Sequence, residues 1–222
     1  MKRISHSTYA TVFAVVYLGL MTNALLLVGC LPLVVLLVTT DPATSWPLLA
    51  VAAPLCAPSV AAAFTVFRDH SRGGTQVARA FFAAWRAVWR KSLALGAMTS
   101  ALLVVLLVDV RAVSAMDISV VVVPLLAVIA LVALAVTLVG LVAIAEEPKA
   151  RLRDVLRASL YLSVRRWYLT AVSLLVLATQ LTLFTSMPAI ALGLTAAPAL
   201  YLAWANSRYT LRPVLETGEA AA

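Results

Sequence analysis

Charged residues are scarce in this chain of 222 residues, at 12% of the total, against roughly 25% in a typical soluble domain. Hydrophobic residues make up 64%, and the mean hydropathy is +1.03. A soluble protein of this length has too little interior to bury so much apolar surface, which excludes a soluble enzyme and a disordered chain. Helices of about 20 residues are the elements that carry long apolar runs across a bilayer. The sequence therefore predicts an all-α polytopic transmembrane helix bundle that forms a single domain over residues 1–222.

Residues that could catalyse a reaction or bind a metal or cofactor are scarce as well. The two cysteines, Cys30 and Cys56, lie inside apolar runs and lack the spacing of metal ligands. The two histidines, His6 and His70, have no nucleophile and carboxylate arranged around them in the sequence. No glycine-rich phosphate-binding loop occurs. We therefore expect no catalytic residue, no metal site and no cofactor, and we interpret the protein as not an enzyme.

Six apolar runs are long enough to predict membrane spans, at about residues 9–38, 46–67, 93–108, 118–145, 167–184 and 188–206. The first run is far longer than the core of about 7–15 residues in a signal peptide, so we expect it to be retained as a helix. Five spans is the alternative, if the last two runs form one helix. A joined helix of about 40 residues would be too long for a bilayer, however, and Pro188 would interrupt it.

Basic residues lie on alternate connections between these runs. If the N-terminus is cytoplasmic, 16 of the 17 Lys and Arg residues fall inside with six acidic residues, and only Arg111 falls outside with three acidic residues. An excess of Lys and Arg on cytoplasmic connections is typical of membrane proteins. We therefore predict that both termini are cytoplasmic and that the protein is a multi-pass protein of a plasma membrane.

The two long cytoplasmic connections, residues 68–92 and 146–166, have amphipathic patterns that predict helices. In the first, Phe81, Trp85, Val88 and Trp89 fall opposite the arginines. Each connection ends in a basic doublet, Arg90-Lys91 or Arg165-Arg166, and the doublets lie 75 residues apart, which indicates a weak parallel repeat. The side chains expected to contact lipid or a partner are Arg79, Trp85, Arg86, Trp89, Arg90, Arg153, Arg157, Arg165 and Arg166.

Two hypotheses account for these basic helices. They lie on the anionic lipids of the inner leaflet, anchored by their tryptophans, or they form a docking surface for a cytoplasmic or membrane partner, such as subunits of an ABC transporter. Nucleic-acid binding is not expected, because a membrane origin explains the interleaved basic and aromatic residues. The oligomeric state does not follow from the sequence.

Polar side chains and prolines inside the runs are the remaining candidates for function. No ionisable residue lies in the middle of a span. Asn23 and Gln180 are expected to form hydrogen bonds between helices. The alternative is that these two side chains line a path for a substrate. The pair Pro54 and Pro58 makes the second span the strongest candidate for a broken helix, although we favour a simple packing kink there. The full set of candidate polar and kink positions is Asn23, Pro32, Pro54, Pro58, Ser59 and Gln180.

Three stretches resemble the YesL-like family of bacterial integral membrane proteins, whose domain has no known function. They are Asn23 to Pro32, with its membrane Asn several residues before Leu-Pro, Ala57 to Arg68, and Phe81 to Arg86. Ala57 stands where the family tends to have Gly, and Val60 where it tends to have Thr. The resemblance covers roughly residues 10–110. It implies five or six spans and an association with genes of carbohydrate-uptake ABC transporters, and it carries no known site residue.

These patterns, together with what the family resemblance implies, lead to one main functional hypothesis. We expect a non-catalytic accessory protein that binds or supports a carbohydrate ABC importer. A small transporter or channel, with a path near Asn23, Pro58 and Gln180, is the alternative. A lipid sensor that uses the two basic helices is a third hypothesis.

Overall fold

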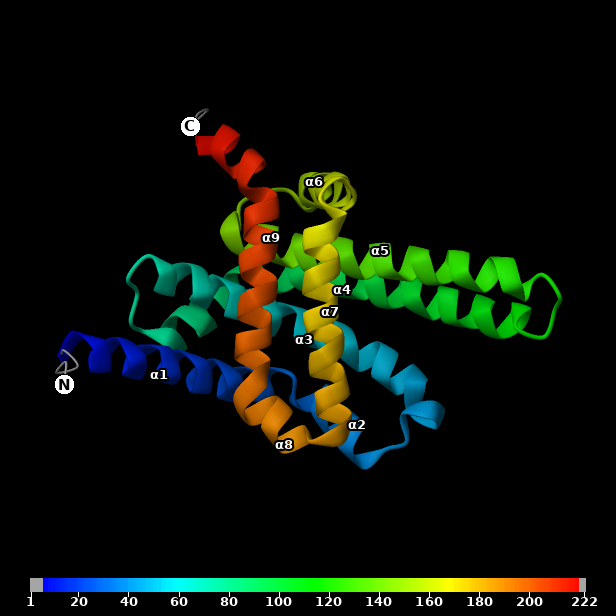
Figure 1. Cartoon of the computed structure of the whole chain (residues 1–222), viewed down its shortest axis with the longest axis horizontal. Coiled ribbons are helices and arrows are strands. Elements are labelled where there is room, and N and C mark those ends of the chain that lie inside the picture. Colours follow the sequence, from blue (N-terminus) through cyan, green and yellow to red (C-terminus); the bar gives the residue numbers. More distant parts are fainter. Residues whose placement is uncertain (1–5, 220–222) are drawn as a thin grey trace, which may run out of the picture.

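The computed structural model describes residues 6–219, with side chains described for residues 13–211, and no strand occurs within that range. Figure 1 shows α7 and α9 crossing in front of α3, α4 and α5. The helices are α1 (His6–Gly29), α2 (Leu31–Thr39), α3 (Pro42–Ser71), α4 (Val77–Val113), α5 (Ser119–Glu146), α6 (Leu152–Arg165), α7 (Trp167–Ser186), α8 (Pro188–Ile190), a π-helical turn (Ala191–Thr195) and α9 (Ala196–Glu219). The expected all-α class is confirmed.

Five helices are long and apolar enough to cross a membrane: α3, α4, α5, α7 and the continuous stretch Pro188–Leu211. The first apolar run is divided into α1 and α2, which meet at a bend of 75° and count as a sixth crossing if they form one span. The protein is thus a multi-pass membrane protein. The last two runs are two helices, separated at Met187.

The break in the bundle lies in the first run, whereas the second run, the strongest candidate for a broken helix, forms one continuous helix. Pro32 lies in the first turn of α2. Backbone N–H groups in a first turn have no partner within the helix, so the lack of an N–H in proline costs no hydrogen bond there. Gly29 ends α1 against α3, and a Cβ added to it would lie 2.2 Å from Ser59 Oγ. The bend therefore needs a residue without a side chain at its corner.

The helix α3 runs without interruption through Pro54 and Pro58. Pro54 has no N–H for the carbonyl of Ala50, one turn earlier, and the hydroxyl of Ser100 on α4 donates to that oxygen at 2.5 Å instead. Gly96 lies so close that an added Cβ would be 3.3 Å from Pro54 Cα. The neighbouring helix thus satisfies the freed group and packs against the proline, so α3 stays continuous.

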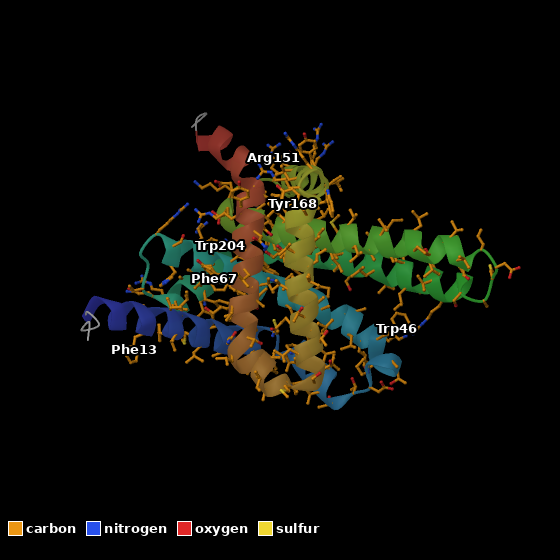
Figure 2. The ribbon with its side chains drawn as sticks, viewed as in Figure 1. Phe13, Trp46, Phe67, Arg151, Tyr168 and Trp204 are labelled. Carbon is orange, nitrogen blue, oxygen red and sulfur yellow. The ribbon has the colours of Figure 1, made fainter. Side chains whose placement is uncertain are left out.

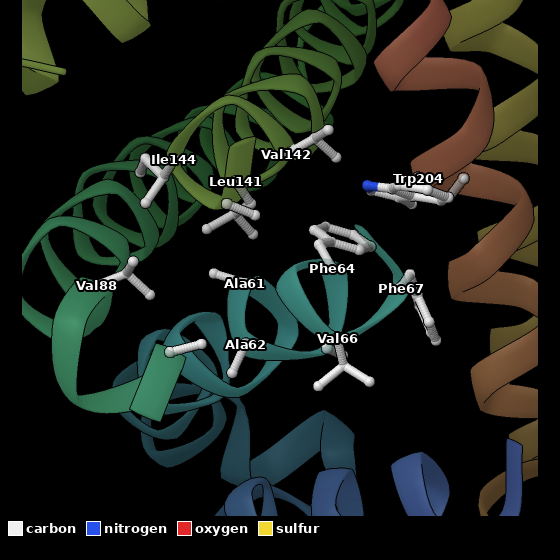
Figure 3. Packing of buried hydrophobic residues seen from close by; sticks show 14 of the residues in the cluster. Ala61, Ala62, Phe64, Val66, Phe67, Val88, Leu141, Val142, Ile144 and Trp204 are labelled. Atoms are coloured by element: carbon white, nitrogen blue, oxygen red, sulfur yellow. The ribbon is translucent and has the colours of Figure 1, made fainter. Parts of the chain in front are cut away.

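The core lies where α3 meets α4, α5 and α9 (Figure 3). Ala61, Ala62 and Ala63 are fully buried and allow the helices to approach closely. Phe64 is fully buried beside the end of α5, which contributes Leu141, Val142 and Ile144. Figure 2 shows Phe67 near Trp204, and their ring centroids are 6.2 Å apart. This packing fixes α3 relative to α5 and α9.

One helix, α4, replaces two expected elements. The basic amphipathic segment at 75–91 and the span expected at 93–108 form a single helix from Val77 to Val113. Phe81 and Val88 are buried in the core, whereas Trp85 and Trp89 are 38% and 40% exposed. The expected apolar face of this segment is therefore divided between the bundle interior and its surface.

Polar contacts join the helix ends that the charge pattern places in the cytoplasm. Arg68 Nη1, near the end of α3, donates to the backbone oxygens of Ala145 and Glu146 at the end of α5. Lys91 Nζ on α4 donates at 2.6 Å to the backbone oxygens of both Pro148 and Ala150. Arg68 thus satisfies carbonyls that the end of α5 leaves without helical partners, and Lys91 satisfies carbonyls of the α5–α6 connection.

The opposite helix ends also meet. Arg111, the one basic residue expected outside, lies over the ring of Trp46 with its guanidinium carbon 5.3 Å from the centroid. Figure 1 shows the α3–α4 connection, α6 and the end of α9 at the left and top, and the α2–α3, α4–α5 and α7–α8 connections at the right and bottom. The connections therefore alternate between two ends of the bundle.

Candidate functional site

The polar centre of the bundle is a π-helical turn, Ala191–Thr195, which Asn23 contacts from α1. Asn23 is 2% exposed. Its Nδ2 donates to the backbone oxygen of Gly193 at 2.9 Å, and its Oδ1 accepts from the backbone N–H of Ala197 at 2.6 Å. Gly193 and Ala197 are four residues apart and would bond to each other in a regular α-helix. The Asn23 carboxamide thus provides hydrogen-bond partners for the Gly193 oxygen and the Ala197 N–H, which do not bond to each other in the wider π-helical turn.

Gln180 on α7 contacts the same turn. Its Nε2 donates to the backbone oxygen of Ala191 at 2.8 Å, and its Oε1 accepts from the hydroxyl of Thr195 at 2.8 Å. Backbone polar groups within a membrane must find partners inside the protein. Asn23 and Gln180 therefore hold α1 and α7 against an irregular turn, and we name Asn23, Gln180 and residues 191–197 the amide clamp.

The other intramembrane candidates surround the bend of the first run. Ser59 is fully buried, and its hydroxyl has no hydrogen-bond partner among the described residues. Thr22, beside Asn23, is fully buried with an unpartnered hydroxyl in the same sense. Pro54 and Pro58 are buried, whereas Pro32 is exposed. The structure therefore brings Asn23 and Gln180 to one turn, and it places Ser59 at the α1–α2 corner instead.

A second polar centre, which the sequence did not reveal, surrounds Glu146. Its side chain is only 3% exposed, and its Oε1 accepts from the indole N–H of Trp204 at 3.1 Å. The same oxygen lies 3.6 Å from Nε of Arg208, whose guanidinium also lies over the Trp204 ring, 5.2 Å from its centroid. Glu146 is the last residue of α5. We name Glu146, Trp204, Arg208 and Arg68 the end cluster.

The predicted docking residues form two separate exposed surfaces. Arg79, Arg86 and Arg90 are exposed on α4, which packs on α3 and α5. Arg153, Arg157 and Arg165 are exposed on α6, which packs on α5, α7 and α9. We name these triplets the α4 surface and the α6 surface.

Some of these arginine side chains contact aromatic rings. Arg90 lies over Trp89 at 5.3 Å, and Arg165 lies over Tyr161 at 5.8 Å. Arg166, the other base of the second doublet, lies over Tyr209 and donates to its backbone oxygen at 2.8 Å. Arg166 is therefore engaged within the bundle, unlike the exposed arginines beside it.

The α4 surface adjoins a hollow of about 370 Å³ at the α3–α4 connection. Asp69, His70, Gln76 and Arg79 contribute its polar lining. Among residues 13–211, whose side chains the structure describes, no three His, Cys, Asp or Glu side chains are grouped closely enough to hold a metal ion.

Comparison with protein families found a match within the first half of the chain. Residues 19–110 match a family model described as a protein of unknown function, DUF624. The matched segment, which is less than half of the chain, is similar to the DUF624 domain. The resemblance to the YesL-like family, which fits this domain, is confirmed. Searches of curated proteins and of solved structures found no match.

The segment that matches the DUF624 model extends from α1 into the last turn of α4. It includes Asn23, the bend at Gly29, the proline pair of α3 and the whole α4 surface. Gln180, the π-helical turn and the α6 surface lie outside it. The amide clamp therefore joins the matched segment to the C-terminal helices through Asn23.

Proposed function

We propose that this DUF624-domain protein is a non-catalytic accessory protein of the bacterial plasma membrane, which binds subunits of a carbohydrate ABC importer through the α4 surface. The observation that carries the proposal is the rigid presentation of Arg79, Arg86 and Arg90. None of these three guanidinium groups has a hydrogen-bond or ion-pair partner among the described residues, and Phe81 and Val88 anchor the same segment in the core.

The rigidity of this surface supports docking. Because the arginines are on the same continuous helix as a membrane span, their spacing is fixed before a partner arrives. A fixed array of cations loses less freedom on binding than a flexible loop does. Such an array suits an acidic surface on a cytoplasmic protein or on the cytoplasmic face of a permease.

The choice of an importer of carbohydrates rests on the family resemblance. That resemblance implies an association with genes of carbohydrate-uptake ABC transporters. The short connections at the other end of the bundle, such as the single residue Met187 between α7 and α8, leave little chain for a ligand-binding domain there. We therefore place the partner contact on the predicted cytoplasmic end.

A transport path near Asn23, Pro58 and Gln180 has less support. Both carboxamides are engaged with the backbone of the π-helical turn. Pro58 is buried in α3, and Asn23 is almost fully buried. These contacts fit a structural role for the three residues better than contact with a passing solute.

Crosslinking in native membranes tests the proposal. We expect a short amine- or photo-reactive crosslinker to capture a permease or ATPase subunit with the wild-type protein. The triple variant R79Q/R86Q/R90Q should lose most of that product, about tenfold. Arg111→Gln, at the opposite end of the bundle, is the matched control and should retain it. Capture of no transporter subunit, or equal capture by the triple variant, would contradict the proposal.

A further inference from the structure

A groove of about 600 Å³ lies between α5 and α7, at the place where Figure 1 shows α7 crossing α5 below α6. Val128, Leu131 and Ala135 line one wall, and Trp167, Ala171 and Leu175 line the other. The volume is within the range of about 300–1,000 Å³ that is usual for ligand pockets. Most of the lining is apolar and belongs to spans, so the groove suits a hydrocarbon chain.

Two hydroxyl groups interrupt this apolar lining near one end. Ser163, near the end of α6, and Thr170, in the first turns of α7, line the groove and are 4% and 5% exposed. Neither hydroxyl has a hydrogen-bond partner among the described residues. By contrast, Thr179 and Thr182, further along α7, donate to carbonyls one turn earlier. Buried hydroxyls without partners are costly, and acceptors such as the ester oxygens of a lipid would satisfy them.

Cations lead to the same end of the groove. Val164, which lines the groove, lies seven residues after Arg157, so the two share a face of α6, and Arg153 lies one turn earlier on that face. Both arginines are exposed. Neither has a hydrogen-bond or ion-pair partner among the described side chains. Figure 2 shows basic side chains pointing away from the bundle at α6, beside the labelled Arg151.

We propose that this groove is a binding site for an anionic phospholipid. One acyl chain lies between α5 and α7, the ester region contacts Ser163 and Thr170, and the phosphate contacts Arg153 and Arg157. The order of apolar groove, hydroxyls and cations along the site matches the order of chain, ester and head group in such a lipid. A transmembrane helix of a partner would match the apolar part but would offer no anion to the arginines.

The site differs from a general attraction of basic helices to a membrane. A surface effect depends on the number of cations and is screened by salt. A built site also depends on the space between α5 and α7. The proposal therefore predicts that filling the groove removes bound lipid even when every arginine is kept.

Native mass spectrometry of the detergent-purified protein tests this, with phosphatidylglycerol and phosphatidylcholine as the two added lipids. We expect the wild type to retain one phosphatidylglycerol about tenfold better than phosphatidylcholine. Ala171→Phe should reduce that retention about tenfold by filling the groove, and R153Q/R157Q should remove the preference for phosphatidylglycerol. Thr179→Ala and Arg86→Gln are matched controls on α7 and α4 and should bind as the wild type does.

A second measurement keeps the proposal open to refutation if Ala171→Phe fails to fold. Photoactivatable phosphatidylglycerol, with its reactive group on the acyl chain, is reconstituted with the wild-type protein and irradiated. We expect labelled peptides from 128–135 and 163–178. Labelling spread evenly over the apolar helices would overturn the proposal. So would unchanged lipid retention by folded Ala171→Phe, or a protein helix crosslinked in the groove in place of lipid.

Discussion

Residues 77–113 and residues 152–186 present the same order of features in the sequence: a basic amphipathic segment, a basic doublet and an apolar run. Their structures differ. The first forms one continuous helix, α4, whereas the second is divided into α6 and α7 at Arg166. Neither doublet contains Gly or Pro, so no local signal separates the two cases.

The difference indicates that the contacts of the basic doublet determine whether the helix continues through it or ends there. In α4, Lys91 remains helical while its side chain reaches two carbonyls of the α5–α6 connection. In the second region, Arg166 leaves the helical conformation, with φ −115° and ψ 44°, and its side chain reaches Tyr209 on α9. The α4 surface is therefore rigidly joined to a span, and the α6 surface is joined through a bend.

Proline substitution in the first doublet, compared with proline directly after the second, should give the largest effect. Lys91→Pro removes a helical hydrogen bond in the middle of α4 and should lower the free energy of unfolding by about 3 kcal/mol or more. Trp167→Pro, at the first position of α7, should cost much less because that position needs no intrahelical N–H. Unfolding in mixed micelles at rising SDS, followed by circular dichroism, measures both. Equal losses of unfolding free energy in the two variants would contradict the difference that we infer between the two regions.

Loss of the basic side chain alone should have a smaller effect of the same sign. Lys91→Met leaves the carbonyls of Pro148 and Ala150 without their donor, and we expect a loss of about 1–2 kcal/mol, since the site is only partly buried. Arg166→Met removes one exposed hydrogen bond and should cost less than about 1 kcal/mol. The same SDS titration compares them, and a greater loss for Arg166→Met would contradict our account.

The exposed cations of both regions should have the smallest effect on stability. Arg90→Ala and Arg165→Ala each remove an exposed contact with an aromatic ring, at 5.3 Å from Trp89 and 5.8 Å from Tyr161. We expect each to change the free energy of unfolding by about 0.5 kcal/mol. A loss above about 2 kcal/mol in either would show that the surface has a structural role, and would weaken the assignment of these residues to binding.

Much of the fold could be predicted from apolar run length and charge, because lipid imposes both. The runs that became α3, α5 and α7 differ from these helices by only a few residues at either end. The location of the break could not be predicted from proline alone. Pro54 is accommodated by Ser100 and Gly96 on another helix, whereas the break occurs where Gly29 meets Ser59.

The candidate sites were predictable to a lesser extent. Asn23 and Gln180 stood out as polar residues in spans, but their shared target, the π-helical turn, depends on backbone geometry near residue 193. Glu146 could not be recognised, because its partners Trp204 and Arg208 lie about 60 residues away in the chain and meet it only in the folded bundle.

The central claim is that both basic surfaces face the cytoplasm on one end of a membrane-spanning bundle. Cysteine labelling in intact cells tests it most directly, with Cys30 and Cys56 replaced by Ala and single cysteines introduced as Arg86→Cys, Arg157→Cys or Ala115→Cys. We predict that a membrane-impermeant maleimide labels only the Ala115→Cys protein until the cells are opened, after which all three react. Labelling of Arg86→Cys or Arg157→Cys in intact cells would contradict the account.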